Sequence, residues 1–268
     1  MNVASNPVVT PIEGPSLADA AQPSRLLQIW YRTPDWLFRV LGGLFCLGCV
    51  AYRLPAYFRD FWGMGPYYVF ADGSRLQLPW TRVLIDSTML LLGFSYCFRL
   101  PAKSQVSRFR DVAIALLGGF WPMLPFAFGA ALMALNPSWA YQFQAALWPS
   151  VVTLESVVLG ASLIIIGNAI DVSSYWYLFR SFSIVPEARE LITKGPYRLV
   201  RHPVYLGQLI AQAGVWLVFA RLSPLTLSFF LVFIGIQLYR AKLEDQVLHN
   251  AFGDDYQSWK TRTFWFTK

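Results

Sequence analysis

The sequence predicts an all-α, polytopic membrane protein with about six transmembrane helices, a carboxyl-terminal helical hairpin and a cytoplasmic tail helix. Of its 268 residues, 56% are hydrophobic and 14% are charged, whereas a soluble domain carries about 25% charged residues. The apolar runs are long and continuous, which favours helices over the alternating strands of a membrane barrel. The net charge of +7 comes from basic residues between apolar runs, so membrane topology explains it better than nucleic-acid binding does.

Six apolar runs are long enough, alone or with their flanks, to cross a bilayer, because a perpendicular span needs about 17 to 25 residues. The second run is short, and we expect its helix to extend back toward Pro79. Pro122 and Pro125 interrupt the third run and predict a kink there. The predicted spans are residues 36–52, 83–98, 112–135, 151–170, 203–219 and 222–239.

The distribution of lysine and arginine predicts that both termini lie in the cytoplasm. Basic residues gather between the second and third spans, between the fourth and fifth, and after the sixth, and basic loops are retained on the cytoplasmic side. The outer loop at 53–82 is discordant because it carries Arg53, Arg59 and Arg75. We expect the plasma or inner membrane if the protein is bacterial and the endoplasmic reticulum if it is eukaryotic.

The chain divides into three parts on composition. Residues 1–24 are rich in proline, serine and alanine and predict a disordered cytoplasmic tail. Residues 25–150 hold the first three spans with the outer loop 53–82, and residues 151–268 hold the other three spans and the basic tail. Residues 220–224 alone join the last two spans, which predicts a tight antiparallel hairpin.

The apolar runs contain a few acidic and sulfur-containing side chains that are candidate functional groups. Asp86 and Glu155 lie near the ends of spans, and we expect them to have an interfacial or helix-packing role, although buried membrane carboxylates are functional candidates by default. Cys46 and Cys49 have the spacing of a metal knuckle, but no second pair completes a zinc site. The chain has two histidines, so we expect no metal centre.

The stretch GPYRLVRHPVY, residues 195–205, places polar chemistry at the start of an apolar helix. Pro203 suits the first turn of a helix, so His202 occupies or neighbours the cap. The free N–H groups beyond it form an anion site. Tyr205 lies three residues after His202 and therefore on the same helix face. A ligand that carries a carboxylate suits this arrangement.

Arg240 and Glu244 are four residues apart on the helix that leaves the last span, so they also share a face. The predicted hairpin brings them close to His202, where a cation and an acid would complete a site for a zwitterionic ligand and an anionic substrate. Plainer interpretations stay open. The basic residues can simply anchor the helix ends, Arg240 and Glu244 can form a weak surface pair, and His202 can be a cap.

Two stretches together resemble the isoprenylcysteine carboxyl methyltransferase family, which is related to the membrane phospholipid N-methyltransferases. They are RSFSIVPEARELITKGPYRLVRHPVYLGQL, residues 180–209, and LEDQVLHNAFGDDYQSWKTR, residues 243–262. The specific signal is RHPxY followed, across the hairpin, by an acidic pair and FGxxY. The resemblance covers about residues 160–268 and implies that residues 151–268 form a methyltransferase-like catalytic core.

The resemblance implies methyl transfer from S-adenosyl-L-methionine to a hydrophobic substrate. This substrate is a lipophilic small molecule or a lipidated one that enters from the bilayer, among the membrane lipids. Arg240 matches the arginine that holds the substrate carboxylate, and Asp245 stands where the family often has a second glutamate. The residues implied to bind the cofactor are Arg189, Glu190, Leu191, Ile192, Tyr197, His202, Pro203, Val204, Tyr205 and Glu244.

Several other functions stay open from the sequence. The same scaffold suits methylation of a lipid amine or a thiol, and the membrane sterol reductases, which use NADPH, share a similar carboxyl-terminal architecture. A non-enzymatic transporter or sensor is the alternative from a different class. No G-x-G-x-x-G motif follows a predicted strand, so the cofactor would not be bound in the way of soluble Rossmann enzymes.

Overall fold

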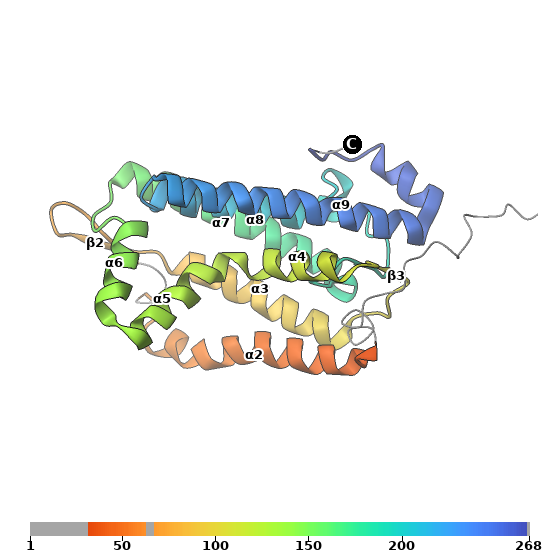
Figure 1. The fold of residues 1–268 in the computed structure, drawn as a ribbon, viewed down its shortest axis with the longest axis horizontal. Helices are drawn as coiled ribbons and strands as arrows, with labels where there is room; N and C mark the ends of the chain where they lie inside the picture. Colours follow the sequence, from red (N-terminus) through yellow and green to blue (C-terminus); the bar gives the residue numbers. More distant parts are fainter. Residues whose placement is uncertain (1–31, 63–66, 267–268) are drawn as a thin grey trace, which may run out of the picture.

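The structure is a computed structural model that describes residues 32–62 and 67–266; the predicted tail at 1–24 lies outside these ranges. The described part is an elongated bundle of helices (Figure 1), as the sequence predicts. Its α-helices are α2 (Asp35–Arg59), α3 (Pro79–Phe98), α4 (Phe109–Phe120), α5 (Leu124–Leu135), α6 (Pro137–Leu147), α7 (Leu154–Leu178), α8 (Pro203–Ala213) and α9 (Pro224–Lys260).

Short strands and tight helical turns connect these helices. β1 (Tyr67–Val69) pairs antiparallel with β2 (Arg75–Gln77), and β3 (Ser104–Gln105) pairs antiparallel with β4 (Glu187–Ala188). The turns are the 3₁₀ segments η2 (Trp121–Met123), η3 (Phe179–Ser181) and η4 (Gly195–Arg198), and the π-helical segment η5 (Gly214–Phe219) that continues α8.

Four helical segments of the described chain are long and apolar enough to cross a bilayer, namely residues 35–59, 109–135, 154–181 and 224–260. The apolar helix Pro203–Phe219 is shorter, and α3, with 20 residues, begins at Pro79 as predicted. Large apolar side chains cover the outside, among them Phe58 and Trp176, which are 84% and 69% exposed. Such a surface requires a partner, and lipid is the partner that these helices fit.

The structure also corrects the predicted spans. The third span is broken between α4 and α5 by η2, so the kink predicted from Pro122 and Pro125 is confirmed. The segment expected to be the following loop is instead helix α6. Its N-cap, Asn136, accepts a hydrogen bond from the Ser138 amide at 2.9 Å, and Pro137 occupies the first turn. Asn-Pro before a run of helix formers is a start signal that was overlooked.

The predicted outer loop 53–82 is wrong in its first part, because α2 continues to Arg59. Arg53 therefore lies in a helix, where its Nε donates to Asp86 of α3 at 3.2 Å. The hydroxyl of Tyr57 donates to the same carboxylate at 2.8 Å. Asp86 is buried, so its predicted helix-packing role is confirmed. Glu155 lies exposed in the first turn of α7.

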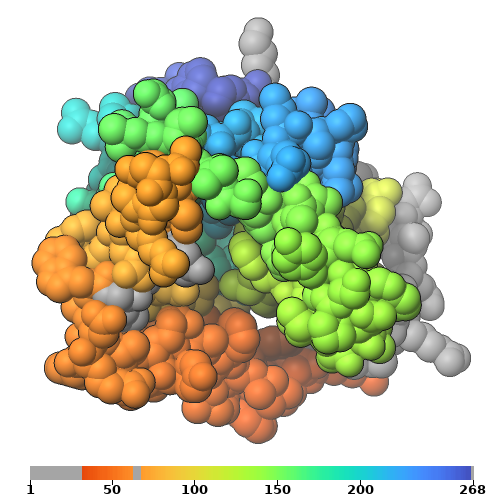
Figure 2. Space-filling model, turned by 90° about the vertical axis from the view of Figure 1, so that its left-hand side faces the viewer, coloured from red at the N-terminus to blue at the C-terminus, as the bar shows by residue number. Residues whose placement is uncertain are grey.

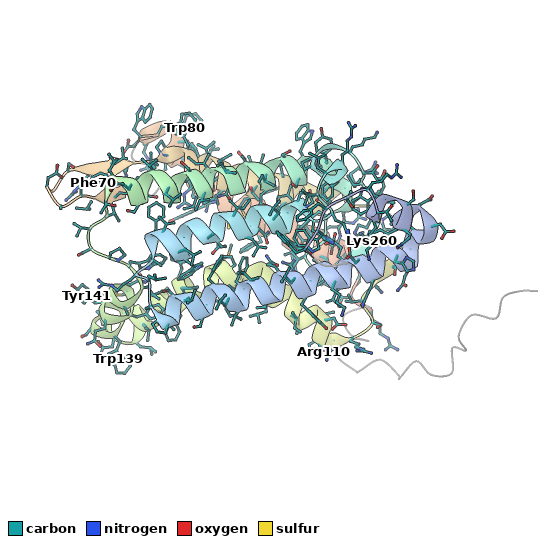
Figure 3. The ribbon with its side chains drawn as sticks, turned by 90° about the horizontal axis from the view of Figure 1, so that it is seen from above. Phe70, Trp80, Arg110, Trp139, Tyr141 and Lys260 are labelled. Atoms are coloured by element: carbon teal, nitrogen blue, oxygen red, sulfur yellow. The ribbon has the colours of Figure 1, made fainter. Side chains whose placement is uncertain are left out.

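The two ends of the bundle differ in chemistry. In Figure 3, Trp139 and Tyr141 lie at one end, and Arg110 and Lys260 lie at the other. The basic connections gather at this second end, where β3 pairs with β4 and the Leu100 amide donates to the Arg180 carbonyl at 2.8 Å. Basic side chains from separate connections thus come together at one end of the bundle.

Helices α7 and α8 pack at backbone contact. A Cβ atom added to Gly167 would lie 2.5 Å from the Ala211 amide nitrogen and 2.5 Å from the Gly207 carbonyl oxygen. Small residues let membrane helices approach this closely. The tight connection from α8 to α9 is confirmed, with Ser223 as the N-cap of α9. The main packing partner of α8, however, is α7 rather than α9.

We expect Gly167→Ala to destabilise the protein by about 1–3 kcal/mol, because the new methyl group overlaps the backbone of α8. Gly235→Ala is the matched control on α9, since a Cβ there meets no atom within 4 Å among the described residues. Alanine at that position should be neutral or stabilising by about 0.5–1 kcal/mol. Unfolding of both purified variants in the same detergent checks the difference, and equal stabilities would contradict the close packing.

Candidate functional site

A cavity of about 970 Å³ runs through the bundle. One of its ends is lined by His202, Arg240 and Glu244, and the other by Tyr68 and Trp148. Figure 2 looks onto this second end, where the surface is hollowed between the orange segment around β1 and β2 and the green α5 and α6. The wall is mostly apolar, and Arg82 and Asp171 also line it. At the first end His202, Arg240 and Glu244 come together, so polar chemistry is best supported there.

His202 and Pro203 open α8 as predicted, with Pro203 in the first turn. The interpretation of His202 as a simple cap is wrong, because its side chain makes no capping hydrogen bond within the described chain. The imidazole instead turns toward α9. Its Nε2 lies 2.8 Å from Oδ1 of Asp245, and its Nδ1 lies 3.5 Å from Oε2 of Glu244. His202 at the start of α8 and the acidic pair Glu244 and Asp245 on α9 therefore meet beside one cavity.

Asp245 is the centre of a buried hydrogen-bonded cluster. Besides the His202 contact, its carboxylate accepts from Nη1 of Arg201 at 3.0 Å and from the hydroxyl of Tyr256. The rings of Tyr205 and Trp265 pack against the imidazole, with centroids 5.6 and 5.0 Å away. Charge-assisted hydrogen bonds of this kind are strong and directional, so they fix the position of His202 at the cavity.

Gly253 explains how Tyr256 reaches that cluster. Its φ of 50° and ψ of −120° break the helical path inside α9, and a residue with a Cβ rarely adopts such a conformation. The last turns of α9 consequently fold back (Figure 1). The chain then returns to the start of the site, where the Arg201 amide donates to the Phe264 carbonyl at 2.9 Å. In the FGxxY motif, Gly253 thus turns the chain and Tyr256 completes the hydrogen bonds around Asp245.

The environment of His202 favours its charged form. Burial lowers the pKa of the imidazole, but the hydrogen bonds and charges of Asp245 and Glu244 outweigh burial and raise the pKa above its ordinary value of 6.5. A raised folded-state pKa means that the protonated imidazole stabilises the fold fully below about pH 6.5. This contribution is then lost as the pH rises through the raised pKa.

We therefore expect the thermal unfolding temperature of the wild-type protein to fall as the pH rises above about 6.5. The fall should be clearly smaller in His202→Gln, which cannot take up the proton. His249→Gln is the matched control, because His249 is exposed. Unfolding curves of the three proteins over that pH range check this, and an unchanged pH dependence in His202→Gln would contradict the assignment.

Arg240 lies buried on the wall of the same cavity. Its Nη1 donates to Oε1 of Gln237 at 2.8 Å and its Nη2 to the carbonyl of Ile184 at 3.0 Å. Nε has no partner within residues 32–62 and 67–266. The guanidinium also lies 5.0 Å from the ring centroid of Tyr205. Neutral groups thus hold Arg240 without cancelling its charge, which leaves it able to attract an anion in the cavity.

The structure brings part of the predicted set together. The cavity is lined by Tyr197, His202, Val204, Tyr205, Arg240 and Glu244. Of the remaining predicted residues, Pro203 begins α8, and the segment 189–192 is not among the described residues that line this cavity. Arg189 lies in a second, smaller pocket, where it forms an ion pair with Glu187. Leu191 and Ile192 pack against a cluster of aromatic side chains, namely Tyr197, Tyr256 and Trp259. Glu190 is exposed.

The sequence reasoning missed two features of the site. Asp245, rather than Glu244, makes the tighter contact with His202, and the neighbouring Arg201 was the available signal because it requires an acid when buried. The second feature is that residues from the first half of the chain form part of the cavity wall. Gly118 of α4 is one example, because a Cβ there would lie 2.7 Å from Cδ of Arg240. Glycine at this position therefore leaves room for the Arg240 side chain.

Comparisons with known proteins point to one enzyme class. A sequence model of the phospholipid methyltransferase family matches residues 156–255. Two curated rice proteins, from Oryza sativa subsp. indica and subsp. japonica, are both named "Probable protein-S-isoprenylcysteine O-methyltransferase". Each is 34% identical to this chain over 107 residues, which are 38% of the chain and 55% of the relative. The chain thus spans about half the length of the curated relatives it matches.

The fold and these matches define a polytopic membrane protein whose carboxyl-terminal part is related to membrane methyltransferases. The resemblance to the isoprenylcysteine carboxyl methyltransferase family, predicted from the motifs at 180–209 and 243–262, is confirmed for this part of the chain. The matched region includes His202, Arg240 and Glu244, so the related segment is also the one that carries the polar end of the cavity.

Proposed function

We propose that this protein is an integral membrane methyltransferase that moves a methyl group from S-adenosyl-L-methionine to a carboxylate of a hydrophobic substrate. One observation carries the proposal. A single cavity joins a long apolar channel to a polar end where His202 and Glu244 lie 3.5 Å apart and Arg240 forms the same wall. A hydrophobic substrate and a charged donor can therefore be enclosed side by side.

The polar end fits a zwitterionic sulfonium compound. The Glu244 side chain is 28% exposed and offers acceptor oxygens, while the first turn of α8 offers backbone amides to a carboxylate. Tyr197 and Tyr205 supply aromatic surface beside them. This surface suits the sulfonium cation and the adenine ring of the donor. When bound, the cofactor supplies a methyl group that is already activated by the positive sulfur.

Arg240 has the task of orienting the substrate. Its guanidinium attracts a carboxylate and can present one oxygen in line with the methyl group. Holding two reactants in such a geometry contributes on the order of 7–11 kcal/mol to catalysis. The apolar walls exclude water, which strengthens the attraction between Arg240 and the carboxylate. The buried cluster around Asp245 keeps His202 fixed, so the site needs little rearrangement.

The position of the site supports an orientation in the membrane. The His202–Asp245 cluster lies at the same end of the bundle as the basic connections and the end of α9. We infer that this end and both termini face the cytoplasm, where the donor is available. The substrate, a lipophilic or lipidated molecule, would then enter the apolar part of the cavity from the bilayer.

The test is methyl transfer by the protein purified in detergent, with S-adenosyl-L-methionine labelled in its methyl group and a panel of amphiphiles. The panel contains carboxylates, amines and thiols with matched apolar chains. We expect label in the carboxylates alone, and mild alkali should release it as methanol because the product is an ester. Alkali-stable label would instead identify an amine or a thiol as the substrate.

Binding measurements separate the remaining alternatives. We expect calorimetric titration to show binding of S-adenosylhomocysteine and no binding of NADPH. Binding of NADPH without the methyl compound would favour a reductase. Binding of neither, together with no transfer to any member of the panel, would contradict an enzyme of this type and leave a transporter or sensor.

A further inference from the structure

Arg82 is a cation in the cavity wall that methyl transfer does not use. It lies close to the start of α3 at Pro79, is half-buried, and lines the far end of the cavity together with Tyr68 and Trp148. Within residues 32–62 and 67–266 its guanidinium makes no hydrogen bond and no ion pair. An arginine without an acidic partner beside an apolar cavity of a membrane protein is a candidate for binding an anion.

The acid closest to Arg82 along α3 is already occupied. Asp86 lies four residues further on and therefore shares a helix face with Arg82. Its carboxylate instead accepts from Nε of Arg53 at 3.2 Å and from the hydroxyl of Tyr57 at 2.8 Å, both on α2. Arg53 thus neutralises Asp86, and the charge of Arg82 stays uncompensated.

The two acidic side chains that line the cavity within the described chain lie toward its other end. Glu244 contacts His202 at the start of α8. Asp171 packs against Gly207, in the same half of α8 as His202. The cavity reaches from His202 to Phe219 along α8 and η5, which is a length on the order of 25 Å. The far end therefore keeps a net positive charge.

Tyr68 adds a second donor at the far end. Its ring stacks on Phe219 with the centroids 4.8 Å apart, and the residue is only 8% exposed. The hydroxyl makes no hydrogen bond within the described residues, yet it is not enclosed by protein atoms. The nitrogen atoms of Arg82 are likewise not enclosed. A guanidinium and a hydroxyl that both remain accessible to an occupant suit the oxygens of a phosphate.

The same end of the cavity is open to an apolar chain. Met123 and Phe126 line the cavity and are also exposed on the outside of the bundle, where Figure 2 shows the surface hollowed beside α5. The 20 residues of α3 span about 30 Å, which is the thickness of the hydrocarbon core of a bilayer. Arg82 near the start of this helix therefore lies at the depth where lipid head groups begin.

We propose that the far end of the cavity binds an acidic phospholipid from the leaflet opposite the His202 end. Its phosphate accepts hydrogen bonds from Arg82 and Tyr68, and one acyl chain occupies the apolar channel. A zwitterionic phospholipid is held less strongly, because its own ammonium group offsets the charge of its phosphate. The inference goes beyond the proposed function, since lipid binding requires no methyl transfer.

The experiment is native mass spectrometry of the full protein, purified in detergent and freed of lipid. It is offered equal amounts of phosphatidylglycerol and phosphatidylcholine with the same acyl chains. For the wild type we expect an affinity at least about fivefold higher for phosphatidylglycerol, because one arginine contributes about this factor to the binding of an acidic lipid. Arg82→Gln should remove most of this preference, Tyr68→Phe should reduce it, and Arg82→Lys, which keeps the charge, should retain most of it.

Arg59→Gln is the matched control, because Arg59 is an exposed arginine at the end of α2, and the preference should be unchanged. An equal loss in this variant would overturn the proposal by indicating attraction to surface charge in general. A wild type without preference, or an unchanged preference in Arg82→Gln, would overturn it as well. Inorganic phosphate that displaces the lipid more strongly than chloride at equal ionic strength would also overturn it, by assigning the site to a soluble anion.

Discussion

Replacing Arg240 by alanine should lower kcat/KM for a carboxylate substrate by about 100-fold or more, as removal of one preorganised charge-stabilising group does elsewhere. The reason is the position of the guanidinium, which lies buried on the cavity wall with its charge held by neutral partners. S-adenosylhomocysteine affinity should change by no more than about threefold, because Arg240 is assigned to the substrate. Steady-state kinetics with calorimetric binding checks both values.

Two controls make the Arg240 result specific. Arg240→Lys keeps the charge but loses the planar fork and should have an intermediate effect. Arg110→Ala removes an exposed arginine at the same end of the bundle and should leave kcat/KM unchanged. Near-normal turnover of Arg240→Ala would contradict a carboxylate substrate and would favour an amine or a thiol.

Asp245→Ala should lower the free energy of unfolding by about 3–5 kcal/mol, because it leaves buried charges without their partner. The carboxylate joins Arg201, His202 and Tyr256, so its loss releases the imidazole from the cavity and uncouples the end of α9. We also expect binding of S-adenosylhomocysteine to be lost. Chemical unfolding in detergent and calorimetry measure the two effects.

Asp254→Ala is the matched control for Asp245→Ala, since Asp254 lies on the same helix but is exposed. It should change the unfolding free energy by less than about 0.5 kcal/mol. The unfolding free energy of Asp245→Asn should lie between those of Asp245→Ala and Asp254→Ala, because the amide oxygen still accepts one hydrogen bond. A stable Asp245→Ala protein with normal cofactor affinity would show that the cluster is not what positions His202.

Much of the fold follows from local patterns in the sequence. Long apolar runs predict membrane helices because the bilayer leaves no other way to satisfy the backbone, and the prolines at 122 and 125 predict the kink between α4 and α5. Helix α6 was missed because its side chains are mixed and its start signal, Asn136 and Pro137, lies where a loop was expected. The length of α2 was missed because Arg53 interrupts its apolar run, although Asp86 pairs that arginine from another helix.

In the candidate site, too, the features that depend on nearby residues could be predicted from the sequence, and those that depend on contacts between distant segments could not. The neighbourhood of His202, Glu244 and Arg240 followed from the tight connection between α8 and α9, which is a local feature. The role of Asp245 depends on contacts between distant segments, which composition and spacing do not encode. The segment 189–192 was implied by resemblance alone. In the structure Leu191 and Ile192 pack against Tyr197, and none of the four residues is among the described residues that line the cavity.

The most direct test of the account is an experimental structure of the protein purified with S-adenosylhomocysteine. We expect the compound at the polar end of the cavity, in contact with Tyr205 and Glu244, with its sulfur turned toward the space in front of Arg240. The apolar channel beyond it should remain open to a lipid chain. Binding at a site that shares no residue with this cavity would contradict the central claim.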